Sequence, residues 1–137
     1  MELTSLDIAS YTEHDADRVP TSTPFEDSIA LRLLPGDCTL SLVAVFSGDA
    51  VEVRESRTLP RMFVTHPEEG GAVAYSVVPL MPSGIERRED AGEVVARYEL
   101  SFRPARAGSH SLILEVGYGN EIVSHDWGIR VRHAYNA

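Results

Sequence analysis

The stretch that decides the fold runs from Arg97 to Val131 and reads RYELSFRPARAGSHSLILEVGYGNEIVSHDWGIRV. Three successive runs within it alternate between residues suited to a core and residues suited to water. The predicted core-facing residues are Tyr98, Leu100, Phe102, His110, Leu112, Leu114, Val116, Trp127, Ile129 and Val131. A period of two places every second side chain on one face of an extended chain. The pattern therefore predicts three strands, each with one face buried.

The same alternation predicts further strands ahead of this stretch. They cover residues 2–10, 28–34, 38–47, 51–55, 62–65 and 72–80. The Pro-Gly-Asp segment at 35–37 has turn chemistry, which predicts a hairpin between the strands on either side of it. The polar, proline-containing segments 11–27 and 81–90 are expected to be loops. The strand at 38–47 is apolar on both faces, which favours a central or covered position.

Strands at this spacing, without any segment of ten or more residues at a helical period, indicate an all-β protein. We expect an immunoglobulin-like antiparallel β-sandwich of eight or nine strands. A chain of 137 residues suits a single domain with one core, so the domain is expected to span residues 1–137.

The last strands resemble those of filamin-type immunoglobulin-like repeats, over roughly a quarter of the chain. The shared pattern is Tyr98-x-Leu100-x-Phe102-x-Pro104-x-x-x-Gly108-x-His110-x-Leu112-x-Leu114-x-Val116. Residues 122–131 are similar to the closing filamin strand, with Asp126-Trp127 in place of Pro-Phe, and the repeats usually have tyrosine where His110 stands. The resemblance implies the sandwich architecture. It also implies partner binding beside the third and fourth strands, which would be 38–47 and 51–55.

The charge of the chain narrows the choice of partners. A net charge of −9 and a pI of about 4.9 disfavour nucleic acid and anionic membrane surfaces, because both attract basic patches. All twelve basic residues are arginine, so no lysine is available for Schiff-base chemistry. No run is long enough to span a bilayer, which predicts no membrane insertion. The acidic N-terminus lacks the features of a signal peptide, so a cytoplasmic location is expected unless a leader has been removed.

The side chains of Cys38 and His110 are expected to be buried and to have structural roles. Cys38 is the single cysteine, so no internal disulfide can form. At the start of an apolar strand it is expected to be a small buried hydrophobe. His110 occupies the place where these sandwiches often have a corner tyrosine, and a buried imidazole hydrogen-bonded to the backbone is expected there. A titrating switch at His110 is the alternative.

Residues that could carry chemistry do not form a recognisable constellation. No two histidines have a metal-binding spacing, although His110, His125 and His133 could still converge in space, and His110 and His133 fall on inward positions of the alternation. Ser124, His125 and Asp126 are the residue types of a catalytic triad, but neighbours along a strand point to opposite faces. No glycine-rich phosphate loop precedes a helix. The sequence therefore predicts no enzyme activity, no cofactor and no metal site.

Sandwiches carry open sheet edges, which bind partners by strand addition. We therefore expect a non-enzymatic protein-interaction module, a subunit or adaptor of a larger assembly whose partner is another protein or its own copies. The candidate partner-binding residues are Val43, Val45, Val51, Val53 and Arg54. Two alternatives stay open: a carbohydrate-binding or accessory domain of a sugar-active system, and a small metal-binding protein.

Overall fold

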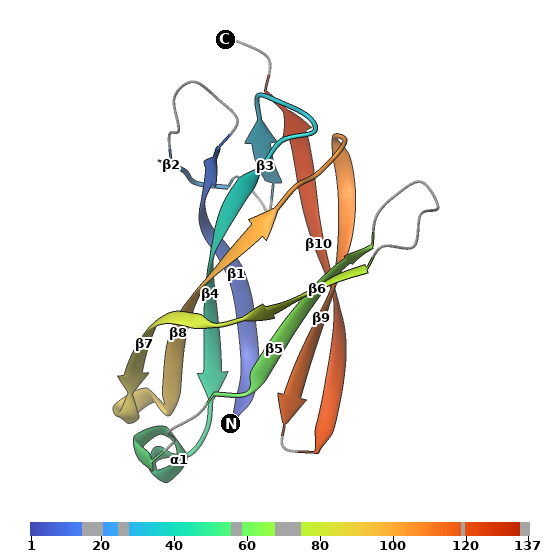
Figure 1. Ribbon diagram of the computed structural model, residues 1–137. Helices are drawn as coiled ribbons and strands as arrows, with labels where there is room; N and C mark the ends of the chain where they lie inside the picture. The colour runs from blue at the N-terminus through green and yellow to red at the C-terminus, as the bar shows by residue number, and fades with distance from the viewer. Residues whose placement is uncertain (15–20, 25–27, 56–58, 68–74, 119, 135–137) are drawn as a thin grey trace.

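The computed structural model describes residues 1–14, 21–24, 28–55, 59–67, 75–118 and 120–134. Strands dominate this part of the chain, with one short α-helix and one 3₁₀ turn (Figure 1). The elements are β1 (Glu2–Glu13), β2 (Thr21–Ser22), β3 (Ser28–Leu31), β4 (Cys38–Ser47), α1 (Ala50–Glu55), β5 (Arg61–Pro67), β6 (Tyr75–Leu80), β7 (Pro82–Arg88), η1 (Glu89–Ala91), β8 (Glu93–Phe102), β9 (Gly108–Tyr118) and β10 (Glu121–His133).

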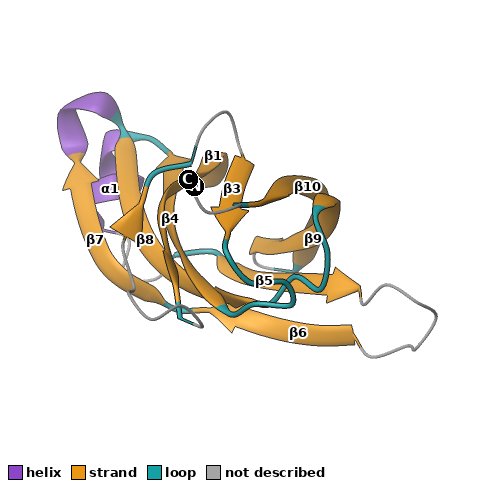
Figure 2. Cartoon of the chain, turned by 90° about the horizontal axis from the view of Figure 1, so that it is seen from above, coloured by secondary structure: helices purple, strands orange, loops and turns teal. Residues whose placement is uncertain are grey.

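The strands form two five-stranded sheets that face each other across one core (Figure 2). The first sheet has the order β2-β1-β4-β8-β7 and the second has the order β3-β10-β9-β5-β6. All neighbouring strands run antiparallel except β3 and β10, which are parallel. The predicted all-β sandwich is confirmed, with this one parallel pair as a departure from the expected antiparallel pairing.

The strand order is that of an immunoglobulin-like sandwich. β1, β4, β8 and β7 correspond to the strands usually called A, B, E and D, and β5, β9 and β10 correspond to C, F and G. β6 extends the second sheet beside β5, and the chain then crosses directly into β7 of the first sheet (Figure 1). β3 belongs to the second sheet, where it pairs with the end of β10. The N-terminus and α1 lie at the lower end of the sandwich in this view.

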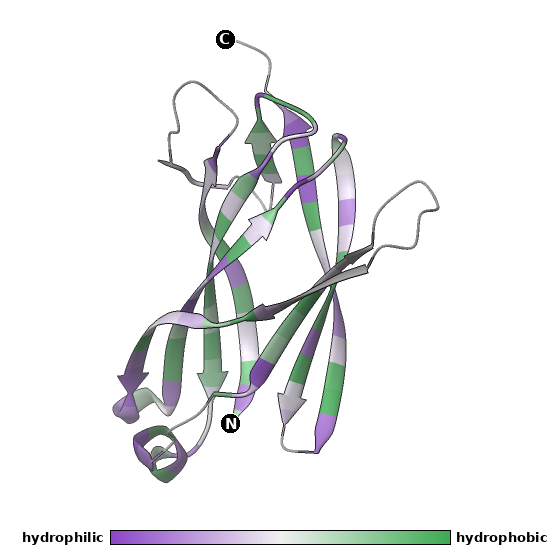
Figure 3. Cartoon of the chain, viewed as in Figure 1, coloured by the Kyte–Doolittle hydropathy of each residue, from purple (hydrophilic) through white to green (hydrophobic). Residues whose placement is uncertain are grey.

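Alternating side chains from both sheets fill the core. Along β4, Leu40, Leu42, Ala44 and Phe46 are fully buried while the residues between them are half-buried. The predicted inward residues of β8 and β9 are also buried, among them Tyr98, Leu100, Leu112 and Leu114. The upper part of β10 shows such an alternation as green and purple bands (Figure 3). Removing these apolar faces from water is the main term that holds the two sheets together.

The predicted strand at 51–55 is wrong, because these residues form α1. Asp49 caps the helix: its Oδ1 accepts a hydrogen bond from the Glu52 amide at 2.8 Å, and its carbonyl accepts one from the Val53 amide at 3.0 Å. The bond from the Glu52 amide is the largest cause that lowers the pKa of the Asp49 carboxyl. The spacing Asp49-x-x-Glu52 is a helix-start signal. Over so few residues, two valines fit a period of two as well as a helical turn.

Two other expectations about connections are also corrected. The segment 35–37 does not close a hairpin, since β3 and β4 belong to different sheets. Both strands point apolar residues at the same core, and periodicity cannot distinguish a hairpin from a connection between sheets. The predicted loop at 81–90 contains β7 and η1. β7 was missed because six of its seven residues are exposed, so its sequence has no apolar alternation.

The lower end of the sandwich depends on a close approach of two glycines. The Gly48 amide donates to the Gly92 carbonyl at 2.9 Å, which ties the start of the α1 connection to the turn before β8. Gly92 has φ of +63°, and a Cβ there would lie 2.6 Å from the Gly48 carbonyl oxygen. In the neighbouring helix α1, Val53 is fully buried. None of the helices in the described residues is both long enough and apolar enough to cross a membrane.

Candidate interaction edge

The five residues predicted to bind a partner do not form one surface. Val43 and Val45 lie on the outer face of β4, half-buried, and Val45 is paired with Val95 of β8. β4 is paired on both sides, with β1 and β8, so it offers no free backbone to an added strand. Val51 and Val53 belong to α1 instead of an edge strand, and Val53 is buried.

Arg54, the remaining candidate, is exposed near the end of the same short helix. The expected strand at 51–55 does not exist, so the edges open to a partner belong to the outermost strands of the two sheets.

Three outer strands of the described structure are poor templates for an added strand. β7 contains Pro82 and a register shift, followed by the charged run Glu86-Arg87-Arg88. These features are typical of a protected edge. β6 carries Pro79, which lacks an amide donor. Along β1, register shifts at two places interrupt the pairing with β4 and distort the outer edge.

The outer side of β3 is closed by two side chains from β1. The Ala30 amide donates to the Tyr11 hydroxyl at 3.1 Å. The amides of Arg32 and Leu33 donate to Oε1 of Glu13 at 2.6 and 3.1 Å. Glu13 is 5% exposed, so this carboxylate is a buried acceptor that needs those two donors. The upper part of the gap between β1 and β10 is thereby sealed.

The edge of β10 below β3 is the least protected in the described structure. β3 pairs only with residues from Arg130 to His133, so residues 121–129 have no strand partner on that side among the described residues. On the other side β10 pairs with β9 from Glu121 to Val131 without any register shift. Residues 121–129 contain no proline, arginine or lysine. A long, regular edge without these protective features is suited to strand addition.

Inward-facing side chains beside this edge are only partly covered. We call this surface the open flank, and it consists of Leu3, Leu6, Ile8, Val123, His125 and Trp127. The three β1 residues and Trp127 are half-buried and pack against the core, whereas Val123 is 36% exposed. Register places Val123, His125 and Trp127 opposite the buried Val116, Leu114 and Leu112 of β9. These β10 residues are more exposed than their β9 partners because β3 covers only the upper end of β10.

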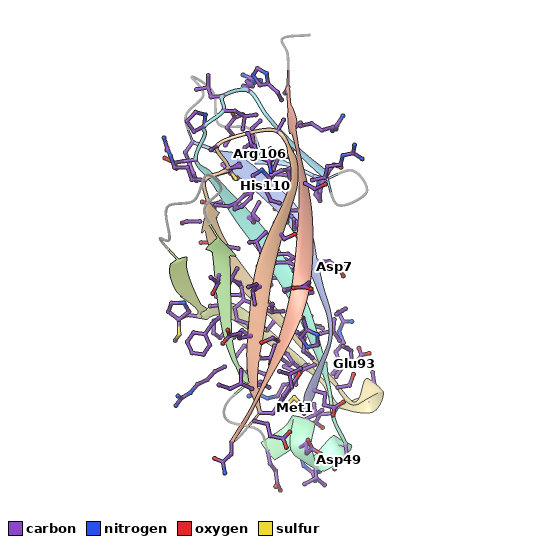
Figure 4. All side chains as sticks on the ribbon, turned by 90° about the vertical axis from the view of Figure 1, so that its right-hand side faces the viewer. Met1, Asp7, Asp49, Glu93, Arg106 and His110 are labelled. Carbon is purple, nitrogen blue, oxygen red and sulfur yellow. The ribbon has the colours of Figure 1, made fainter. Side chains whose placement is uncertain are left out.

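The lower limit of the open flank is also defined by a hydrogen bond. The Leu3 amide donates to the Tyr118 hydroxyl at 2.9 Å, which joins the start of β1 to the end of β9. Figure 4 looks onto this side of the sandwich, with β10 in front and Asp7 of β1 beyond it. The flank thus lies between two cross-sheet ties, Tyr118 below and the Tyr11–Glu13 pair above.

Charge around the open flank has a single sign. Within residues 2–10 of β1 and 121–129 of β10, the ionised side chains are Glu2, Asp7, Glu121 and Asp126. All four are exposed, and neither segment contains arginine or lysine. Carboxylates within about 10 Å of one another reinforce a negative potential at physiological ionic strength. The flank is therefore partly apolar and bordered by acid.

His110 has the structural role that the sequence predicted. Its side chain is 2% exposed, and Nε2 lies 2.8 Å from the Arg106 carbonyl oxygen. The ring also packs edge-on against Phe102, with centroids 5.8 Å apart. A residue at the start of β9 that bonds backbone four residues upstream does the work of the corner tyrosine in other sandwiches.

The histidines of the last strands do not converge. His125 and His133 are exposed on β10. The register puts His133 beside the buried Leu31 of β3, on the inward side that the alternation predicted, and its Nε2 lies 2.8 Å from the Arg32 carbonyl oxygen. His110 is paired with Ile129, four residues from each of them, which separates them by about 13 Å along the strand. No group of three metal-ligating side chains comes together within the described residues.

Cys38 and the triad-type residues also have structural explanations. Cys38 is 1% exposed, and its thiol donates to the Phe102 carbonyl at 3.3 Å. Burial raises the pKa of this thiol to about 12, helped by the nearby carboxylates of Glu13 and Asp37, so the reactive thiolate is absent near neutral pH. In β10, Ser124 and Asp126 point away from the face that carries His125, as the alternation predicted.

Comparison with known proteins adds no relative: no family model, no curated protein and no solved structure matches this chain. The resemblance to filamin-type repeats stays a prediction.

Sequence reasoning identified β10 as a strand but did not identify its free edge. The alternation at Trp127, Ile129 and Val131 shows which face of the strand is apolar. Whether an edge of the strand is free depends on the neighbouring strands, which the alternation does not show. The sequence carried no signal for the free edge, because the predicted strand at 28–34 is longer than β3, which ends at Leu31 and leaves most of the thirteen-residue β10 without a partner on that side.

Proposed function

We propose that this protein is a non-enzymatic interaction module, a subunit or adaptor that binds a protein partner by strand addition to β10. The single observation that carries the proposal is the unpaired, regular edge of residues 121–129 below β3. The outer strands β7, β6 and β1 carry proline, charge or register shifts, and β3 is closed by Tyr11 and Glu13. Proteins usually protect an exposed edge, so an unprotected one favours a binding role.

Two further features support the proposal. The open flank leaves inward residues such as Leu6 and Trp127 partly exposed, and an added strand would cover them. Main-chain hydrogen bonds along such a strand supply affinity, while alternate side chains in contact with the flank supply selectivity. The single cysteine is buried and cannot pair within the chain, which is compatible with a reducing, cytoplasmic setting.

The test is a pull-down from a lysate of the source organism with the wild type and Val123→Lys as baits. Val123 points inward at the edge and is 36% exposed, so lysine can reach solvent there without unfolding the core. An inward charge at an edge is a natural block to strand addition. We expect Val123→Lys to lose the captured partner while its melting temperature stays within about 3 °C of the wild type.

The matched control is Ser101→Lys, which adds the same charge at an exposed position of β8. This variant should retain the partner. Capture that is equal for all three baits would rule out the β10 edge. A second measurement applies if Val123→Lys is unstable. A photo-crosslinking side chain at position 124 should form a covalent bond with the partner, and the same side chain at position 101 should not.

A further inference from the structure

We infer that the occupant of the open flank is a basic, amphipathic extended segment of another protein, with apolar and cationic residues in alternation. The inference rests on the proposed function and specifies its partner. It follows from three observations: the length of the free edge, the apolar side chains on its inner side and the uniform acidity of its borders.

The length of the edge sets the length of the segment. β3 already covers Arg130 to His133, so the added strand fits below it along residues 121–129. At about 3.3 Å per residue, roughly eight residues fill this space. The segment continues the line of β3, whose Ile29 and Leu31 are fully buried in the same gap between the sheets. β3 thus shows what a strand in this line does: it points alternate apolar residues into the core.

The inner side of the flank selects apolar residues. Leu6 and Ile8 on β1 and Trp127 on β10 pack against the core but remain partly exposed. Every second side chain of an added strand points toward them, because side chains alternate across a strand. Apolar side chains at those positions gain burial, whereas polar ones lose hydration without a partner.

The outer side selects cationic residues. Asp126 lies on the outward face of β10, Glu121 lies at its lower end and Asp7 lies on the opposite border. The two bordering segments contain no arginine or lysine, and the whole chain carries a net charge of −9. Charge complementarity therefore favours lysine or arginine at the outward positions of the segment. The same acidity disfavours a second copy of this chain, because two β10 edges would bring like charges together.

The test uses three labelled synthetic peptides of about eight residues. One alternates valine and lysine, one contains the same residues in two blocks, and one alternates valine and glutamate. Fluorescence anisotropy measures affinity, and amide chemical shifts of residues 121–129 report the place of binding. We expect the alternating valine–lysine peptide to bind at least about tenfold more tightly than the other two and to shift those amides.

Protein variants separate the effect of charge near the edge on peptide binding from the effect of the net charge. Asp126→Arg should weaken the valine–lysine peptide about tenfold or more, and Glu99→Arg, an exposed site on β8, should leave its affinity within about twofold. Equal weakening by both variants would overturn the inference, and so would equal binding of the block peptide. Each result would show attraction by net charge alone.

The remaining outcomes distinguish the two proposals. If the valine–glutamate peptide binds as well and shifts the amides of residues 121–129, the edge binds strands but the predicted basic chemistry is wrong. If no peptide shifts these amides, both the inference and the proposed function fail. A dimer in sedimentation whose β10 amides are protected from exchange would identify a second copy as the occupant and overturn the inference.

Discussion

At the scale of single residues, β9 separates core from surface most clearly. Leu114 is 3% exposed between the two sheets, whereas its neighbour Ile113 is half-buried on the outer face. Leu114→Ala should lower the free energy of unfolding by about 2–5 kcal/mol, the range for emptying a leucine site in a core. Ile113→Ala should cost less, because its face is only partly covered. Urea denaturation of both variants measures the difference, and equal losses would contradict a single core.

His110 is the second residue whose role can be measured directly. His110→Phe keeps an aromatic ring against Phe102 but removes the hydrogen bond to the Arg106 carbonyl. We expect a loss of about 1–2 kcal/mol in the free energy of unfolding, the usual effect of leaving such an acceptor without its partner. His110→Tyr restores a polar group that can reach the backbone, so it should recover part of the loss. A tyrosine variant no more stable than the phenylalanine variant would contradict the corner-tyrosine role.

At the scale of elements, the turn before β8 requires glycine. Gly92→Ala forces a side chain into a left-handed backbone conformation and toward the Gly48 carbonyl, 2.6 Å from the new Cβ. The expected loss is about 1–3 kcal/mol. The matched control is Gly84→Ala in β7, where the closest atom, Cδ of Arg97, is 4.0 Å away. Thermal melts should show a lower melting temperature for Gly92→Ala and little change for Gly84→Ala.

The capping of α1 by Asp49 predicts that the stability of the folded protein depends on pH. The folded protein lowers the pKa of Asp49 below its ordinary value of 3.8, chiefly through the Glu52 amide. A lowered carboxyl pKa stabilises the folded state fully above the ordinary value, and this stabilisation is lost as pH falls through the lowered folded pKa. Asp49→Ala should therefore melt at a lower temperature than the wild type at pH 7, and the two melting temperatures should converge as the pH falls below 3.8. A constant difference across this range would mean that the carboxylate does not cap α1.

At the scale of the whole molecule, the edge of β10 below β3 is the least protected one among the described strands. Alternate amides of β10 bond β9, and the others point to the free edge. Hydrogen exchange should therefore alternate between slow and fast along residues 122–128, while residues 113–117 of β9, which are paired on both sides, should all be protected. Uniformly slow exchange along β10 in the free protein would show that the edge is already covered.

The sequence by itself determined the class of fold and most of the core. Alternation at Tyr98, Leu100, Leu112 and Leu114 identified the buried faces, because side chains on a strand point to opposite sides with a period of two. The likeness to immunoglobulin-like sandwiches also predicted a buried, backbone-bonded His110, as the structure shows. These features depend on residues close together in the sequence, so they can be predicted from local patterns.

Only the tertiary structure decided which strands are neighbours, and the candidate site depends on that. Val43 and Val45 looked suited to an edge, but β4 is paired with β1 and β8. The free edge belongs to β10, because β3 pairs with only its last four residues and Tyr11 and Glu13 seal the gap above. Pairing between strands distant in sequence depends on how whole faces fit together across the core. Periodicity reports which face is apolar, whereas the partner of each edge is fixed only when both sheets have formed.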